Sequence, residues 1–221
     1  RLEPVRDGLA QVQDEGSQLI ARATALAPLQ GADEQWLDLC AGPGGKTALL
    51  GALAAQRGAH VTAVEVAPHR AELVASATKS LPVTVVTADG RESDLAAASF
   101  DRVLVDAPCT GLGALRRRPE ARWRRQPGDI PALVKLQREL LASAIQLTRP
   151  GGVIVYSTCS PHLAETVGVV SDAVRRYAVS AEDARAVFPG VDGLGDADAV
   201  QLWPHRHGTD AMFTALLRKH A

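Results

Sequence analysis

The stretch WLDLCAGPGGKT, residues 36–47, decides the fold class, because it has the pattern of a strand, a glycine-rich turn and the start of a helix. Gly42, Gly44 and Gly45 permit a tight turn and a close approach of a ligand to the backbone. The spacing is not the G-x-G-x-x-G of dinucleotide-binding proteins. A G-x-x-x-x-G-K-[ST] phosphate loop would need a glycine in place of Cys40. The stretch therefore predicts a nucleotide-like ligand without a pyrophosphate.

Strand-like and helix-like segments alternate around this stretch. Apolar, largely β-branched runs predict strands at residues 36–41, 60–66, 83–90, 100–108 and 151–158. Helix-like segments occupy residues 47–57, 68–80, 130–149 and 162–177. This alternation predicts an α/β fold of the doubly wound kind, with a mostly parallel sheet covered by helices on both faces.

The two ends of the chain extend this pattern. Residues 9–26 have helical spacing of apolar residues and are expected to pack on the sheet edge, within a helical lead-in over residues 1–30. Residues 180–198 are rich in Asp, Gly and Ala, which predicts a loop. Residues 199–219 predict an antiparallel hairpin that closes the sheet. With no internal repeat, we expect one domain over residues 1–221.

Composition excludes several classes of protein. The 221 residues are 46% hydrophobic, enough for one core, yet they contain no apolar run of about 18 residues and no signal-peptide pattern. Three widely spaced cysteines predict neither a disulfide framework nor a zinc site. We expect a cytoplasmic monomer without a metal or a membrane partner. Because the sequence begins with Arg1, we expect it to be part of a longer chain.

Acidic residues follow three successive predicted strands. Glu65 ends the second strand, where a carboxylate can accept both ribose hydroxyls, and Asp89 and Asp106 end the next two. Any one of these acids alone is better explained as a helix cap or turn residue. Three of them around one glycine turn favour an adenosine-containing ligand, and without a pyrophosphate the best fit is S-adenosylmethionine.

Cys109 and Cys159 follow the fourth and fifth predicted strands, which should be neighbours. Ligands of doubly wound sheets bind beyond the carboxyl ends of the strands, so both thiols are expected to face the ligand. Most cysteines are small buried hydrophobes, and we interpret Cys40 in this way. The polar and turn-forming neighbours of the other two cysteines argue against that role; they are Asp106, Pro108, Thr110, Ser157, Thr158 and Ser160.

A thiol beside a methyl donor suggests methylation of a pyrimidine at carbon 5. That carbon is too weak a nucleophile unaided, and a thiolate that adds to carbon 6 activates it. After methyl transfer, a base removes the proton from carbon 5 and the thiol is eliminated. Asp106 is expected to protonate or hydrogen-bond the ring. The order of the strands does not decide which of the two cysteines attacks.

Six arginines and Trp123 crowd residues 115–125, LRRRPEARWRR. A net charge of −1 argues against a bulk polyanion binder, and most charge runs are solvated faces. Pro119 and the position after a strand predict a loop, and an arginine-aromatic loop suits phosphate contact and base stacking. We therefore predict RNA contacts from Arg116, Arg117, Arg118, Arg122 and Trp123.

Several motifs resemble those of one enzyme family: DLCAGPGGKT, DAPCTGLGALRRRPEARW and YSTCSPHLAET, with VQDEGSQL and HGTDAMFTALLRK in support. The chain resembles the catalytic domain of the RsmB (Sun/Fmu) and NOL/NOP group of RNA cytosine-5 methyltransferases. The match covers nearly the whole chain, and the paired PC and TC cysteine motifs are specific to this group. RsmB-type proteins often carry a helical N-terminal RNA-binding domain, and none is visible in this sequence.

The resemblance implies a Rossmann-like class I methyltransferase fold and roles for individual residues. It assigns Cys159 as the nucleophile and Cys109 as the residue that assists product release. It implies S-adenosylmethionine contacts at Cys40, Ala41, Gly42, Pro43, Gly44, Gly45, Lys46, Glu65, Asp89 and Asp106. The chain departs from the family in having Thr110 where many relatives have Ser, and DAMF at 210–213 where Asp-Gly-Phe-Phe is more usual.

The sequence therefore predicts transfer of a methyl group from S-adenosylmethionine to carbon 5 of a cytosine in RNA, with 16S-type ribosomal RNA as the expected substrate. The alternatives are a transfer RNA cytosine-5 methyltransferase and a non-catalytic ribosome-assembly factor that binds cofactor and RNA. The glycine spacing disfavours a nucleotide-dependent oxidoreductase. His162, Glu165, His205 and His207 could support the site, although caps and turns explain them at least as well.

Overall fold

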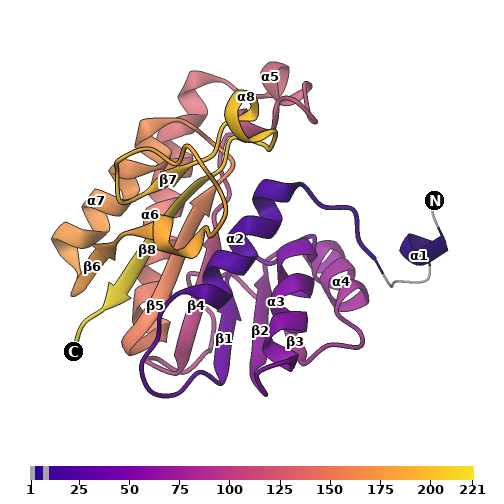
Figure 1. Ribbon diagram of the computed structural model, residues 1–221, viewed down its shortest axis with the longest axis vertical. Coiled ribbons are helices and arrows are strands. Elements are labelled where there is room, and N and C mark those ends of the chain that lie inside the picture. The colour runs from indigo at the N-terminus through magenta and orange to yellow at the C-terminus, as the bar shows by residue number, and fades with distance from the viewer. Residues whose placement is uncertain (1–2, 7–9) are drawn as a thin grey trace.

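The computed structural model describes residues 3–6 and 10–221, and over these residues the chain forms one mixed sheet flanked by helices (Figure 1). The strands are β1 (Gln35–Asp38), β2 (His60–Glu65), β3 (Val83–Thr87), β4 (Phe100–Asp106), β5 (Thr148–Thr158), β6 (Val179–Glu182), β7 (Val200–Gln201) and β8 (Phe213–Lys219). Their order is β3-β2-β1-β4-β5-β8-β6, and β7 pairs with β8. The first five strands are parallel, whereas every pairing made by β8 is antiparallel.

Helices cover both faces of this sheet. The α-helices are α1 (Glu3–Arg6), α2 (Glu15–Leu26), α3 (Gly45–Ala55), α4 (Pro68–Ala77), α5 (Ala121–Arg124), α6 (Ile130–Leu147), α7 (Val167–Arg176) and α8 (Pro204–His207). Short 3₁₀ turns are η1 (Leu112–Ala114), η2 (Pro127–Asp129), η3 (Leu163–Glu165) and η4 (Ala184–Val187). The prediction of an α/β doubly wound sheet with an antiparallel C-terminal part is confirmed.

The core has two parts, one on each face of the sheet, because successive side chains of each strand alternate between the faces. In β4, Leu104 packs with Ile20 of α2 and Leu50 of α3, whereas Val103 and Val105 pack on the side of α6 and α7. Successive side chains of a strand point to opposite faces, so one continuous apolar run supplies both halves of the core. Figure 1 shows α2 and α3 over one face and α6 and α7 over the other.

The N-terminal helix differs from its prediction in extent and position. Helix α2 begins at Glu15, because the side chain of Asp14 caps it by accepting from the Gly16 N–H at 3.0 Å. Residues 10–14 are not helical, and the expected start at position 9 lies outside the described residues. The helix does not pack on the sheet edge: Ile20 is buried in the cluster that covers the central strands β4 and β5.

The C-terminal region is also more elaborate than a closing hairpin. Strands β7 and β8 do pair antiparallel, but α8 lies between them and β8 is inserted between β5 and β6. Strand β6, at the edge, and η4 both lie in the region expected to be a loop. Pairing of β6 with β8 through four residues supplies a stabilisation that its own polar sequence does not indicate. In the described part of the chain, no helix has the length and apolar character needed to span a membrane.

Candidate active site

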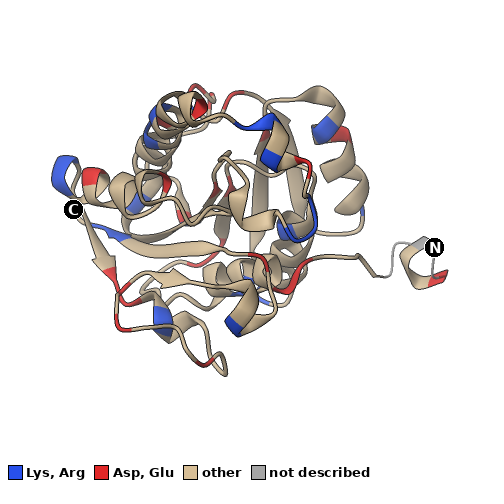
Figure 2. Ribbon diagram, turned by 90° about the horizontal axis from the view of Figure 1, so that it is seen from above, with Lys and Arg blue, Asp and Glu red and all other residues tan. Residues whose placement is uncertain are grey.

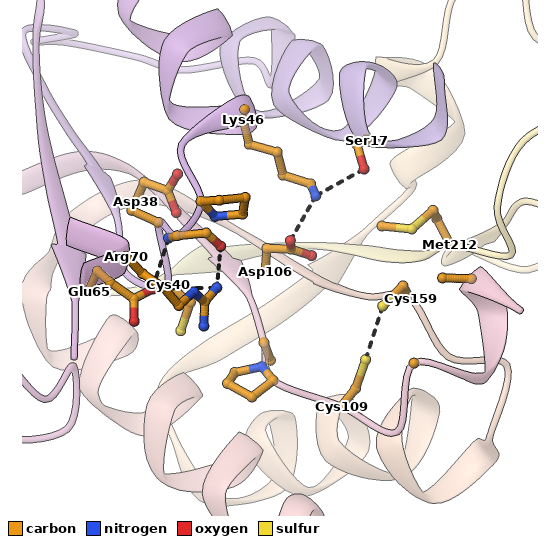
Figure 3. A pocket seen from close by; sticks show the side chains of 18 of the residues that line it. Ser17, Asp38, Cys40, Lys46, Glu65, Arg70, Asp106, Cys109, Cys159 and Met212 are labelled. Carbon is orange, nitrogen blue, oxygen red and sulfur yellow. Dashed lines mark hydrogen bonds and ion pairs between the residues drawn. The ribbon is translucent and has the colours of Figure 1, made fainter. Parts of the chain in front are cut away.

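The glycine turn joins β1 to α3 and brings its backbone against two charged side chains (Figure 3). The Gly42 N–H donates to Glu65 Oε2 at 2.9 Å, and the Arg70 guanidinium donates to the Gly42 carbonyl oxygen. A Cβ at Gly42 would collide with Glu65 Oε2, so any other residue would push the Glu65 carboxylate away from the Gly42 N–H. Gly44 has φ of 105°, the left-handed region that favours glycine. The turn therefore depends on glycine for both space and conformation.

A buried acid at the end of β1 lies beneath this turn. Asp38 Oδ2 accepts from the Thr47 hydroxyl at 2.7 Å, whereas Asp38 Oδ1 is buried without a partner among the described residues. Burial raises the pKa of Asp38 to about 6, against the lowering effect of the Thr47 hydrogen bond, and the nearby Asp106 carboxylate raises it further. Asp38 was not among the residues predicted for the site, although Asp38 is the first residue of the motif that contains the glycines.

Lys46 connects the turn to the end of β4. Its Nζ lies 2.7 Å from Asp106 Oδ2 and 3.2 Å from Ser17 Oγ of α2. Both interactions are drawn in Figure 3. Burial alone would lower the pKa of Lys46, but the Asp106 carboxylate outweighs it and leaves that pKa raised. Lys46 is therefore held as a cation whose charge lies on the side of the cavity where the thiols are.

The two cysteines at the ends of β4 and β5 are in direct contact. Cys109 Sγ and Cys159 Sγ are 3.4 Å apart, and the two sulfurs point toward each other in Figure 3. The hydrogen bond from Cys109 lowers the pKa of Cys159, with a further contribution from the Lys46 charge that opposes burial. The same hydrogen bond, together with burial, raises the pKa of Cys109. Cys159 is consequently the more acidic thiol of the pair.

These groups share one cavity of about 930 Å³. Its lining includes the turn residues Cys40, Ala41, Gly42, Pro43, Gly45 and Lys46, the acids Glu65, Asp89 and Asp106, and both Cys109 and Cys159. Gly44 lies within the turn but does not line the cavity. Burial raises the pKa of the Cys40 thiol well above its ordinary value, so this third cysteine remains protonated.

Sequence comparison places this arrangement in a known family. The model of the family described as "16S rRNA methyltransferase RsmB/F" matches residues 23–218. The chain belongs to the RsmB/F family.

Individual relatives agree with this assignment. Over 220 residues the chain is 69% identical to a Mycobacterium tuberculosis protein named "Putative methyltransferase Rv1407", covering 99% of this chain and 48% of that protein. It is 38% identical over 217 residues to the ribosomal RNA small subunit methyltransferase B of Pectobacterium carotovorum, covering 96% of this chain and 48% of the relative. The chain thus spans about half the length of the curated relatives that it matches.

Among solved structures, the chain is similar to NSun6 of Pyrococcus horikoshii, crystallised with SFG. The TM-score is 0.84 with 30% identity, over 100% of this chain and 56% of that one. The family assignment confirms the resemblance predicted from the DLCAGPGGKT, PC and TC motifs.

In this RsmB/F family member, the arginine-rich segment is divided between internal and outward-facing residues. Arg117 forms a two-pronged ion pair with the carboxylate of Asp210, and Arg116 Nη2 lies 2.9 Å from Asp14 Oδ2. Asp14 and Asp210 are both buried, so these two arginines neutralise internal charges. Both remain half-exposed, but the guanidinium groups predicted to contact RNA are already engaged within the protein.

The rest of the segment is more open. Arg118 lines the cavity and forms no ion pair with any described residue. Trp123 is 76% exposed and stacks with Arg122, whose guanidinium carbon is 5.1 Å from the ring centroid; neither residue lines the cavity. Around the molecule, positively and negatively charged positions are interspersed (Figure 2). The segment, predicted as a loop, contains the short helix α5 between η1 and η2.

Some site residues are placed differently from their predicted roles, and some were not predicted. Asp89 lines the cavity but is bound by Arg91, whose hydrogen bonds lower the pKa of Asp89. Ser17 of the VQDEGSQL segment and Arg125 of the arginine-rich segment reach the site although neither was predicted to, and Arg70 comes from a segment without a recognisable motif. Arg125 donates to the Thr110 carbonyl at 3.3 Å. The partners in these contacts come from distant parts of the chain, so the sequence does not indicate them even where a motif marks one of the residues.

Proposed function

We propose that this chain is a methyltransferase domain that transfers a methyl group from S-adenosylmethionine to carbon 5 of a cytosine in RNA of the small ribosomal subunit. The observation that carries the proposal is the 3.4 Å contact between the Cys109 and Cys159 sulfurs on the wall of the cavity that the glycine turn also lines. Membership of the RsmB/F family, and a relative named ribosomal RNA small subunit methyltransferase B, support the substrate.

The residues of the cavity fit S-adenosylmethionine. Gly42 leaves the backbone open where a side chain would collide with Glu65, and the Glu65 carboxylate is buried beside it. The buried and unpartnered Asp38 Oδ1 adds a second anionic acceptor under the turn. The glycine turn, Glu65 and Asp89 would hold the molecule, which supplies an electrophilic methyl group when bound. The NSun6 structure that resembles this chain was solved with SFG, which supports a methyl-donor ligand for this fold.

Cys159 is proposed as the nucleophile. Its pKa is lowered by the Cys109 hydrogen bond, which increases the thiolate fraction that can add to carbon 6 of the base. Addition forms a sulfur–carbon bond and makes carbon 5 nucleophilic enough to accept the methyl group. The target base must leave its stack to reach the thiol, because carbon 6 is inaccessible within a helix. Asp106, held by Lys46, would hydrogen-bond or protonate the ring.

Cys109 is proposed to assist release. When a base removes the carbon 5 proton, the electron pair restores the ring double bond and the bond from carbon 6 to Cys159 breaks. The departing sulfur regains its negative charge, and the Cys109 S–H, 3.4 Å away, can donate a hydrogen bond to it. The raised pKa of Cys109 keeps that proton in place. The contact between the two sulfurs thus explains why two thiols act on one cytosine ring.

Methyl transfer from labelled S-adenosylmethionine tests this function. We would compare wild type, C159A and C109A on small-subunit ribosomal RNA and on transfer RNA, with digestion to nucleosides to locate the label. We expect 5-methylcytidine in ribosomal RNA with wild type, no label with C159A, and an RNA–protein adduct stable to denaturation with C109A. Label retained with C159A would overturn the choice of nucleophile, and label only in transfer RNA would overturn the proposed substrate.

A further inference from the structure

A buried carboxylate joins the two loops that carry the thiols. The Glu165 side chain is 0% exposed, and its Oε1 accepts from the Thr110 N–H at 2.9 Å and from Gln137 Nε2 at 3.0 Å. Its Oε2 accepts from the Thr110 and Ser160 hydroxyls, both at 2.6 Å. Four converging donors replace the water that the charged group loses on burial.

The donors to Glu165 are neighbours of the two cysteines. Thr110 directly follows Cys109, and Ser160 directly follows Cys159. Gln137 of α6 also donates to the carbonyl oxygen of Pro108, at 2.9 Å, so the two neighbours of Cys109 are held by Gln137 and by Glu165. The carboxylate therefore connects α6 with the two cysteine loops, which we name the PC loop (residues 107–111, after β4) and the TC loop (residues 159–162, after β5).

We propose that Glu165 is a positioning residue that fixes the separation of the Cys109 and Cys159 sulfurs, so that the Cys109 thiol stays within hydrogen-bond distance of Cys159. Its consequence for methyl transfer rests on the function proposed above. A carboxylate only accepts hydrogen bonds, whereas an amide of the same shape presents two N–H donors on one side. In Glu165→Gln the amide oxygen can still accept at the Oε1 position, but the Thr110 and Ser160 hydroxyls would have to turn and accept from the amide N–H groups. The charge-assisted hydrogen bonds that draw the two loops together would be lost, and the loops that carry the two sulfurs would shift apart.

Oxidation of the thiol pair measures this separation without RNA. Diamide takes two electrons and two protons from the thiols and becomes a hydrazine, leaving a Cys109–Cys159 disulfide that mass spectrometry of the peptides identifies. Diamide first adds to one thiolate, and the second thiol then attacks that sulfur, so the rate depends on how close the pair lies. With E165Q we expect disulfide formation to slow about tenfold or more. S160A removes one of the four hydrogen bonds and should give a smaller decrease in the same direction.

Asp101→Asn is the matched control. Asp101 is a buried carboxylate that accepts from the Glu34 and Gln35 N–H groups at 2.9 and 2.8 Å, at the end of β4 remote from the thiols. Its loss should lower the midpoint of thermal unfolding without slowing disulfide formation at a temperature where the variant remains folded. If D101N slows the oxidation as much as E165Q, or if E165Q oxidises at the wild-type rate, the positioning role is overturned.

Steady-state methylation is measured on the same variants. For E165Q we expect kcat to fall about 100-fold, with the KM for S-adenosylmethionine changed less than about twofold, because Glu165 does not line the cavity. An equal loss in binding of S-adenosylmethionine would indicate a general structural defect and would contradict the positioning role. If wild type methylates no RNA while E165Q still slows the oxidation relative to D101N, the proposed function fails and the positioning role stands.

Discussion

At the scale of single residues, two thiols in contact acquire different acidities from their surroundings. Cys109 is more deeply buried than Cys159, which disfavours a negative charge on Cys109, and the contact between the sulfurs can then stabilise a thiolate at Cys159. Lys46 adds a positive charge on the same side. The order of the strands left the choice of nucleophile open. The deeper burial of Cys109 and the Lys46 charge favour Cys159 as the thiolate, which is the choice that the family resemblance implies.

The first prediction concerns the pH dependence of Cys159 reactivity. Cys109→Ala removes the donor, so the pKa of Cys159 should rise and its thiolate fraction at neutral pH should fall. Alkylation of Cys159 by iodoacetamide at pH 7.5 should slow about three- to tenfold, and its pH profile should move to higher pH. Cys109→Ser keeps a donor and is the control. Identical profiles for C109A and C109S would contradict the role of the hydrogen bond.

The second prediction concerns Asp38 and stability. Its pKa is raised to about 6 in the folded protein, so the folded state binds a proton more tightly than the unfolded state. This contribution to stability is fully present below about pH 3.8 and is lost as the pH rises through about 6, with a maximum size of about 3 kcal/mol. Urea unfolding of wild type and D38N from pH 4 to pH 8 measures it. The stability of wild type relative to D38N should fall over that range; parallel curves would exclude a raised pKa.

At the scale of elements, the segment after β4 is packed tightly against the TC loop. The Gly113 N–H donates to the Cys159 carbonyl at 2.9 Å, and the Gly113 carbonyl accepts from the Ala211 N–H at 2.9 Å. A Cβ at Gly113 would lie 2.0 Å from the Ala211 oxygen and 2.8 Å from the Cys159 oxygen. Backbone atoms cannot yield as a flexible side chain can, so the backbone of Cys159 is held in place by a glycine.

The third prediction follows from this contact. Gly113→Ala should destabilise the protein by about 2–3 kcal/mol, because the new methyl group forces two backbone segments apart. Thermal unfolding and the rate of Cys159 alkylation are the measurements. Gly128→Ala is the matched control, since a Cβ there meets nothing within 4 Å; this residue lies in η2, which follows the arginine-rich segment. Equal stability of G113A and wild type would show that the contact is not tight.

The same scale shows what the sequence could predict. Strands β1, β2, β4 and β5 were predictable because their buried, apolar runs serve both faces of the sheet. Strand β6 was not, since its stability comes from pairing with β8 and not from its own sequence. The motifs located the turn and both cysteines. Asp38 and the contact between the sulfurs required the tertiary structure, because each depends on groups from separate parts of the chain. Glu165 was named from the sequence only as a residue that could support the site, and its partners in α6 and the two cysteine loops came from the structure.

At the scale of the whole molecule, one charge cluster joins three distant segments. Asp14 caps α2, Arg117 belongs to the arginine-rich segment, and Asp210 precedes β8. The Asp210 N–H donates to Asp14 Oδ1 at 3.2 Å, and Arg117 pairs with both acids. This cluster fixes the arginine-rich segment beside the cavity. It also explains why a run of arginines that resembles an RNA-binding loop is in part internal.

The fourth prediction distinguishes an arginine that pairs with a buried acid from one that lines the cavity and forms no ion pair within the described part of the chain. Arg117→Gln should cost about 1–2 kcal/mol in urea unfolding, because it leaves the buried Asp210 carboxylate with weaker partners. Arg118→Gln makes the same change of charge at a residue that has no ion pair among the described residues and should cost less than about 0.5 kcal/mol. Conversely, R118Q should weaken RNA binding and reduce its salt dependence. Equal losses of stability in both variants would contradict this division.

Capture of the covalent intermediate tests the central claim most directly. Small-subunit ribosomal RNA that contains 5-fluorocytidine would be incubated with wild type and S-adenosylmethionine. In this RNA a fluorine replaces the hydrogen at carbon 5 that a base would remove as a proton, so elimination of the cysteine is blocked. We predict a stable adduct in which peptide mass spectrometry finds a methylated fluoropyrimidine on Cys159, with Cys109 unmodified. An adduct on Cys109, or methylated RNA product without any adduct, would contradict the account.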